Sequence, residues 1–174
     1  GNTATSGGGI YLDNSTLTLV NSIVWGNSGA GNIYVLDDSD FETINLYNSI
    51  LEGGTTASTT ATGIRLQNGS PADALTLNTN ATINTNPNLV ALADNGGYVQ
   101  TMAIPTGSSA ADIGLYIRQK GTTFYYSSDA STWYSNLALS TAATLPADAT
   151  NPIATDARGT ARSAKPDAGA FEVQ

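Results

Sequence analysis

An internal repeat of short apolar runs is the feature that most constrains how this chain can fold. The segment Gly9-Ile10-Tyr11-Leu12 recurs as Asn32-Ile33-Tyr34-Val35 and, more weakly, as Gly63-Ile64-Arg65-Leu66. A second apolar run follows each copy, over residues 17–23, 44–50 and 75–79. A constant motif at variable spacing predicts stacked repeats whose loops differ in length.

The apolar residues within these runs alternate with polar ones. Leu17 and Leu19 do so in the first run, and Ile44 and Leu46 in the second. This is the periodicity of a strand with one buried face. No segment suits the long helical crossover of a βαβ unit. We therefore predict an all-β right-handed parallel β-helix, or solenoid, in which each strand pairs with its equivalent about 4.8 Å away.

Two further features bear on this fold. Asn21 and Asn48 occupy equivalent positions after the second run, where we expect them to stack at a turn and adopt a left-handed conformation. Charged residues make up only 11% of the chain, which is rich in Thr, Ser, Asn and Gly, all poor helix formers. An antiparallel β-sandwich is the alternative, because it also consists of short alternating strands.

Motifs along the chain resemble those of a known family. In order, they are GGGIY at 7–11, NSIVWGN at 21–27, DNGG at 94–97, GSSAADIG at 107–114, TDARG at 155–159 and DAGAFE at 167–172. This series resembles the C-terminal region of pectin lyase-like, right-handed parallel β-helix proteins that carry a choice-of-anchor Q domain. The resemblance implies a secreted protein of the bacterial cell surface. The chain departs from the family at Ser109, where Pro is usual, and at Ala111, where Ile is usual.

The later motifs predict a cap. We assign residues 1–93 to β-helix rungs and 94–174 to a C-terminal cap region with an insert at about 115–150. The end of a solenoid needs covering because it exposes strand edges and core. Candidate cap residues are Asp112, Asp156, Arg158, Asp167 and Glu172. We expect Arg158 to pair with at least one of these carboxylates and to hold the returning C-terminus.

The insert predicts an aromatic β-hairpin. Residues 122–126 and 133–134 flank a polar turn at 127–132. The turn resembles the Asp-box hairpin of sialidase-like propellers but lacks its Gly, and we infer no function from it. Tyr125, Tyr126, Trp133 and Tyr134 are candidate ligand-binding residues, because Tyr and Trp suit glycan or protein recognition. The preferred interpretation is that most of them pack the hairpin instead.

An acidic stretch offers weak calcium candidates at Asp37, Asp38 and Asp40. Paired carboxylates could also serve a polysaccharide hydrolase. The family's hydrolases have a His and a basic residue near the acids, and neither is present here. A solvated loop is the preferred interpretation.

Charge and composition exclude several classes of function. The net charge is −8 with only 6 Lys and Arg residues, which argues against binding nucleic acid or an anionic membrane surface. The chain has no Cys and no His, which excludes disulfides, thiolate nucleophiles and a Ser-His-Asp centre. No apolar run could insert into a bilayer. We expect no cofactor.

The sequence therefore predicts a non-catalytic, extracellular structural or adhesive module, and we expect it to be a piece of a longer protein. One alternative is a carbohydrate-binding or polysaccharide-degrading β-helix protein. Another is a head-to-tail surface fibre subunit. Expected partners are a glycan or surface protein, and either upstream rungs or another copy of the chain at the N-terminal edge.

Overall fold

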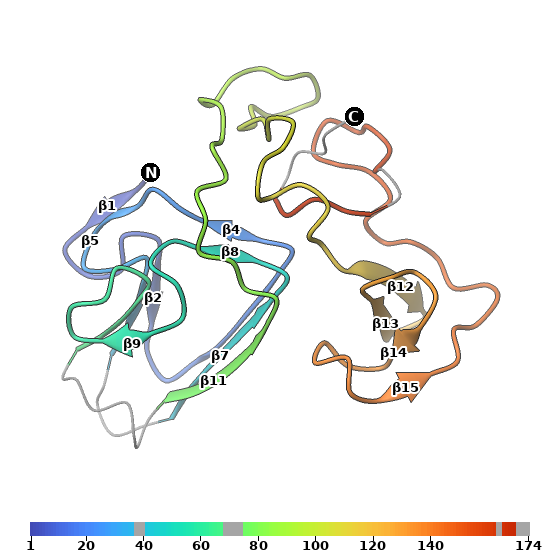
Figure 1. Cartoon of the computed structure of the whole chain (residues 1–174), viewed down its shortest axis with the longest axis horizontal. Coiled ribbons are helices and arrows are strands. Elements are labelled where there is room, and N and C mark those ends of the chain that lie inside the picture. Colours follow the sequence, from blue (N-terminus) through green and yellow to red (C-terminus); the bar gives the residue numbers. More distant parts are fainter. Residues whose placement is uncertain (37–40, 68–74, 163–164, 170–174) are drawn as a thin grey trace. The chain divides into compact units, whose positions relative to one another are not determined.

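The chain divides into two compact units. In the computed structural model, unit 1 spans Gly1–Asn86 and unit 2 spans Pro87–Gln174, whereas the expected boundary lay at 93/94 (Figure 1). The structure describes residues 1–36, 41–67, 75–162 and 165–169. All the regular elements in these ranges are strands, and none is a helix. The protein is therefore all-β.

Unit 1 is built of short strands that pair in parallel. They are β1 (Thr3–Ala4), β2 (Ile10–Leu12), β3 (Thr16–Val20), β4 (Ile23–Val24), β5 (Ser28–Gly29), β6 (Ile33–Val35), β7 (Glu42–Tyr47), β8 (Ile50–Leu51), β9 (Ala57–Ser58), β10 (Ile64–Leu66) and β11 (Leu75–Asn80). They form the sheets β1-β5, β2-β6-β10-β9, β3-β7-β11 and β4-β8. Parallel pairing throughout the described part of unit 1 rules out the antiparallel β-sandwich there.

The register of these sheets matches the sequence repeat. Ile10 pairs with Ile33 and Ile33 with Ile64, which confirms that the three Gly-Ile-Tyr-like segments are structurally equivalent. Ile23 pairs with Ile50, and an isolated bridge joins Ile50 to Ile83. Three successive stretches of chain thus stack strand on strand.

The core of unit 1 lies between its sheets. Along β7, Ile44 and Leu46 are fully buried and alternate with half-buried residues, because successive side chains point to opposite faces of a strand. The apolar cluster comprises Leu12, Val24, Ile33, Val35, Ile44, Leu46, Leu51, Ile64 and Leu66. All but Val24 and Leu51 belong to the repeated runs, and those two lie in β4 and β8 directly after them.

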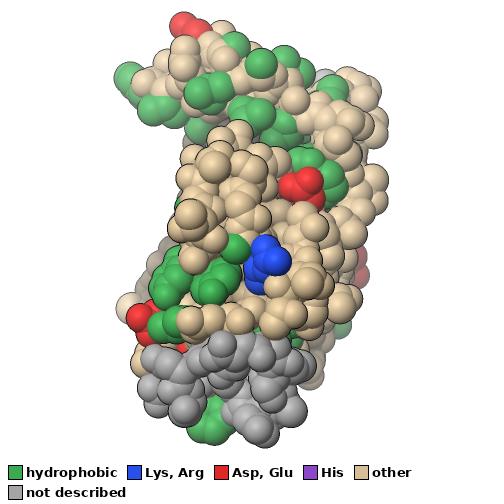
Figure 2. All heavy atoms as spheres, turned by 90° about the vertical axis from the view of Figure 1, so that its left-hand side faces the viewer, with side chains coloured by type: hydrophobic (Ala, Val, Ile, Leu, Met, Phe, Trp, Pro, Cys, Tyr) green, Lys and Arg blue, Asp and Glu red, His purple; other side chains and the backbone are tan. Residues whose placement is uncertain are grey.

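The outward face of the same sheets carries polar and aromatic stacks. The Asn78 side-chain amide donates to Asn45 Oδ1 at 2.9 Å, and the Asn45 amide donates to Thr18 Oγ1 at 3.0 Å. The Tyr11 and Tyr34 rings stack with their centroids 5.6 Å apart. The face drawn in Figure 2 is accordingly dominated by uncharged polar and backbone atoms, with few charged side chains.

The turn after the β3-β7-β11 sheet has a left-handed residue in every repeat. Asn21, Asn48 and Ala81 have φ of 50°, 47° and 50°. The expected left-handed conformation of the two Asn residues is confirmed. Ala81 occupies the third position without the polar side chain that makes this conformation favourable for Asn.

The described part of unit 2 contains one antiparallel sheet, in the order β12-β13-β14-β15. Its strands are β12 (Tyr116–Lys120), β13 (Thr123–Ser127), β14 (Trp133–Tyr134) and β15 (Ala142–Ala143). Tyr126 pairs with Tyr134, so the hairpin expected from residues 122–134 is present. Gly121, with φ of 59°, turns β12 into β13 and extends the hairpin by a strand that the sequence had not indicated.

Candidate functional site

Two motif segments of unit 2 that are distant in sequence join through their backbones. The Gly114 amide donates to the Pro166 carbonyl at 2.7 Å, and the Ala168 amide donates to the Ala110 carbonyl at 2.9 Å. The Asp112 amide donates to Asp167 Oδ1 at 2.7 Å, and Asp167 is almost fully buried. We call residues 110–114 with 166–168 the clasp. A buried carboxylate that accepts a backbone N–H makes this junction more than a surface contact.

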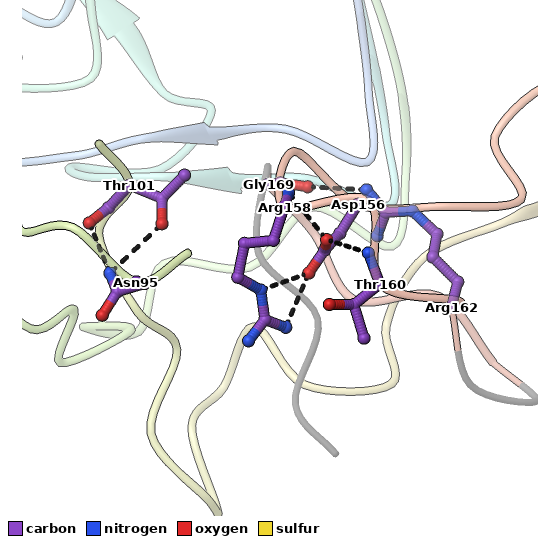
Figure 3. A network of polar contacts seen from close by, with 7 residues as sticks. All are labelled: Asn95, Thr101, Asp156, Arg158, Thr160, Arg162 and Gly169. Carbon is purple, nitrogen blue, oxygen red and sulfur yellow. Dashed lines mark hydrogen bonds and ion pairs between the residues drawn. The ribbon is translucent and has the colours of Figure 1, made fainter. Parts of the chain in front are cut away.

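Asp156 organises the loop that precedes the clasp (Figure 3). Its Oδ2 pairs with Arg158 at 2.6 Å from Nη2 and 2.7 Å from Nε. Its Oδ1 accepts the amides of Arg158 at 2.8 Å and Thr160 at 3.1 Å. The ion pair expected of Arg158 is present, and its partner lies only two residues away. The pair therefore orders its own loop.

The DNGG turn packs against this loop. A Cβ added at Gly97 would lie 2.6 Å from Arg158 Cα, and Gly97 has φ of 97°, so both space and backbone require glycine there. Within the turn region, the Asn95 side-chain amide donates to the Thr101 carbonyl at 2.7 Å (Figure 3). Four of the resembling motifs thus meet in two pairs within unit 2, DNGG with TDARG and GSSAADIG with DAGAFE.

The remaining candidate cap residues take other positions. Asp112 is exposed, with φ of 55°, and contributes its amide to the clasp. Glu172 lies outside the described residues. Arg162, which the sequence had not singled out, donates from Nη2 to the Gly169 carbonyl at 3.2 Å.

The four candidate aromatic residues are divided between the two faces of the hairpin sheet. Tyr126 lies directly opposite Tyr134, so these two share one face, and the strand alternation puts Tyr125 and Trp133 on the other. Trp133 is buried, and the Arg118 guanidinium lies 5.6 Å from its ring centroid. Burial raises the pKa of Tyr126. The four residues therefore do not form a single recognition surface.

Asp129 holds the turn between β13 and β14. Its Oδ1 accepts the amides of Thr132 and Ser131, each at 2.8 Å, and the Ser127 hydroxyl at 2.9 Å. These bonds, the Thr132 amide first, hold the pKa of the Asp129 carboxyl well below its ordinary value. Ala130 adopts φ of 62° within this turn.

A cavity of about 290 Å³ lies along the edge of β12. It is lined by residues 116–118 together with Ala130, Asn151, Ile153, Arg162 and Pro166. Next to it, an isolated bridge joins Gln119 to Thr150, with hydrogen bonds of 2.8 and 2.9 Å between their backbones. Asn151 and Ile153, just beyond this bridge, contribute to the lining.

The acidic stretch cannot be placed, because Asp37, Asp38 and Asp40 lie outside the described residues. The neighbouring Glu42 is fully buried at the start of β7, and its Oε1 accepts the Asn14 amide at 3.2 Å. Among the described residues, no group of three or more His, Cys, Asp or Glu side chains is placed to hold a metal. The same part of the chain contains no helix long and apolar enough to cross a membrane.

Sequence reasoning missed the cavity, Asp129 and the buried Glu42. The Asp129 turn follows a Ser-x-Asp pattern that local hydrogen bonding could have suggested. No sequence signal brings Arg118 and Arg162 to one cavity, because they belong to segments outside any repeat. In comparisons with known proteins, no protein-family model, curated protein or solved structure matches this chain.

Proposed function

We propose that this chain is a non-catalytic structural or adhesive module of an extracellular bacterial surface protein. The observation that carries the proposal is the stacking of three successive repeats in register, with Ile10, Ile33 and Ile64 in one ladder and Ile23, Ile50 and Ile83 in another. Stacked repeats form an extended surface from one short motif that is used several times.

We infer further that unit 1 is part of a right-handed parallel β-helix. Support comes from the parallel pairing of equivalent strands, from the buried apolar stack between sheets, and from the repeated left-handed turn at Asn21, Asn48 and Ala81. Connections between parallel strands are right-handed in the great majority of proteins, and this favours a right-handed coil.

The surface location rests on the resemblance of the motifs to choice-of-anchor Q proteins. The contact of the DNGG turn with the Arg158 loop, and the clasp between residues 110–114 and 166–168, support a common role for these motifs. The low content of charged residues and the stacked Thr and Asn side chains suit a surface module that presents polar, uncharged area.

The test is binding without turnover. The purified 174-residue chain is applied to a glycan array and to bacterial surface polysaccharides, and the same polysaccharides are assayed for new reducing ends and unsaturated products. We expect retention on at least one surface or glycan and no cleavage. Cleavage that Asp38→Ala abolishes would overturn the proposal in favour of a polysaccharide-degrading β-helix protein.

A fibre subunit is the second candidate, and the strand edges of unit 1 favour it. In the described sheets β2, β3 and β4 are each terminal, so their outer edges face the next position in the stack. Upstream coils or another copy would fit there by parallel pairing. Light scattering over a hundredfold concentration range tests this, and a strict monomer throughout would remove the fibre alternative.

A further inference from the structure

The two ends of the β2-β6-β10 sheet differ in what covers them. β2 is a terminal strand, whereas β9 pairs in parallel with the outer edge of β10. Ile10 and Ile64 occupy equivalent positions on β2 and β10, yet Ile64 is fully buried and Ile10 is partly exposed. β9 places Ala57 next to Ile64, and Ala57 packs against the core cluster. One end of this sheet is therefore closed from within unit 1, and no described strand covers the other.

β9 belongs to an excursion of the chain that interrupts the repeat. The step from the second Gly-Ile-Tyr-like segment to the third is 31 residues, eight more than the step from the first to the second. We call residues 54–61 the excursion. Its two ends lie together, because a Cβ added at Gly53 would lie 2.8 Å from the carbonyl carbon of Thr62. The chain could therefore pass from Gly53 to Thr62 without the excursion, and the repeat would keep its shorter length.

The excursion is held against β10 by side chains as well as by strand pairing. The Arg65 guanidinium donates from Nε to the Thr59 carbonyl at 2.7 Å. The Thr60 amide donates to the Ser58 hydroxyl at 3.3 Å, in the turn that leads back toward β10. These contacts give the excursion a fixed position on the strand edge that it covers.

The two ends of the stack would fit each other if β9 were absent. β10 and β11 would then be terminal strands at one end, and β2 and β3 are terminal at the other. Parallel addition in the existing register would place Ile10 of one copy beside Ile64 of another, and Leu17 beside Leu77. Leu17, Leu77 and Ile10 are only partly buried in the single chain, so such stacking would remove apolar surface from water.

β9 occupies the position on β10 that β2 of another copy would take. An exposed strand edge can pair with another chain, and natural proteins cover such edges with short segments. We propose that the excursion is a stop that prevents copies of this chain from stacking head to tail. The proposal rests on the stacked repeats behind the proposed function and specifies what controls the fibre alternative.

The experiment removes the stop from the full chain. Deletion of residues 54–61 joins Gly53 to Thr62 and gives the second step of the repeat the length of the first. The masses of both chains are measured by light scattering over a hundredfold range of concentration, and their folding is checked by circular dichroism. We expect the parent chain to stay monomeric and the deletion variant to form assemblies about tenfold or more larger in mass. A parent chain that forms fibres, or a folded deletion variant that stays monomeric, would overturn the proposal.

A proline at the uncovered edge tests which strand the assemblies use. The Ile10 amide donates to the Asn32 carbonyl and the Leu12 carbonyl accepts the Leu36 amide, so the Tyr11 N–H between them points away from β6. Tyr11→Pro removes this outward donor and keeps the pairing with β6. In the deletion variant, we expect it to raise the concentration at which assemblies form about tenfold or more. Tyr11→Ala is the matched control, because it loses the ring and keeps the N–H, and an equal effect of the two substitutions would contradict pairing through the β2 edge.

A second variant keeps the proposal testable if the deletion disturbs folding. Ala57→Pro together with Ser58→Pro keeps the chain length and removes both backbone donors of β9. Thr55→Pro is the matched control, because Thr55 lies in the excursion but outside β9. We expect only the double variant to assemble, and assembly of the control to the same extent would refute the role of β9. Retention on surfaces is measured on the parent chain, so a stop that fails this test leaves the adhesive proposal intact.

Discussion

The two units bury apolar and polar side chains in different proportions. The apolar cluster of unit 1 consists of aliphatic side chains stacked in register, with Ile33, Ile44 and Ile64 wholly inaccessible. Unit 2 buries a few apolar residues, such as Ile104 and Leu115, and relies more on polar groups bonded to backbone. Its buried polar residues are Thr101, Ser108, Ser127, Asp156 and Asp167.

This difference shows that a repeated and a non-repeated region are stabilised by different interactions. In unit 1 each repeat presents the same apolar side chain to the same place, so most of its burial is aliphatic and accumulates by stacking, although Asn32, Glu42, Asn48 and Ser49 are buried as well. In unit 2 each buried polar group needs its own partner at the correct distance, because an unpaired one is costly. Deletion of buried methyl groups should therefore lower the stability of unit 1 most. Deletion of a single buried hydrogen-bond acceptor should lower the stability of unit 2 most.

The largest expected effect is in the core of unit 1. Ile44→Ala removes buried methyl groups beneath fully covered strands and should lower the free energy of unfolding by about 3 kcal/mol. Urea unfolding can be followed unit by unit, because Trp25 lies in unit 1 and Trp133 in unit 2, so that Trp25 reports alone in a Trp133→Phe background. The control, Phe41→Ala at an exposed position of unit 1, should cost no more than about 0.5 kcal/mol. Equal losses of unfolding free energy in the two variants would contradict the importance of aliphatic burial in unit 1.

The next effect tests unit 2. Asp156→Ala removes the carboxylate that pairs with the Arg158 side chain and accepts the Arg158 and Thr160 amides. We expect a loss of about 2–3 kcal/mol, detected through Trp133 in a Trp25→Phe background. The matched control is Asp148→Ala, whose ion pair with Lys120 is exposed and should contribute little. A loss under about 0.5 kcal/mol in Asp156→Ala would show that this buried network adds nothing.

A smaller effect concerns imperfect repetition within unit 1. Ala81→Asn restores the residue found at the left-handed position in the two earlier repeats and should raise the free energy of unfolding by about 1 kcal/mol. Asn21→Ala should have the opposite sign and a similar size. If Ala81→Asn destabilises the protein, the third turn does not favour Asn at its left-handed position as the first two turns do.

The smallest effect is a pH dependence in unit 2. Backbone hydrogen bonds hold the pKa of Asp129 below its ordinary value of 3.8, so its support for the turn is complete above that pH and is lost as the pH falls toward the lowered pKa. Asp129→Asn should therefore be less stable than the parent at pH 7, and the gap should narrow below about pH 4. A gap that is constant with pH would exclude the carboxylate as its cause.

The sequence predicted the strand pairings of the repeated segments correctly. It did not predict contacts between side chains that occur only once in the chain. The structural equivalence of Ile10, Ile33 and Ile64 follows from the repeated sequence motif, because parallel in-register strands place equivalent residues next to one another. The pairing of Arg158 with one of four candidate carboxylates, Asp156 among them, was expected, but the motifs did not indicate which of the four would be the partner. Nothing in the order of residues indicates that Arg162 lines a cavity with Arg118, because that proximity arises from the clasp and the β12 edge together.

The polar stack on the outer face of unit 1 gives the repeats a direction. Asn78 donates to Asn45, and Asn45 donates to Thr18, so every amide in this row points toward the first repeat. The two ends of the row are chemically unlike: the Thr18 hydroxyl is left to donate onward, whereas Asn78 offers its carbonyl oxygen as an acceptor. A coil added beyond β3 would continue the row with an acceptor in line, and one added beyond β11 would continue it with a donor. The hydrogen-bond sense of the row therefore favours head-to-tail stacking.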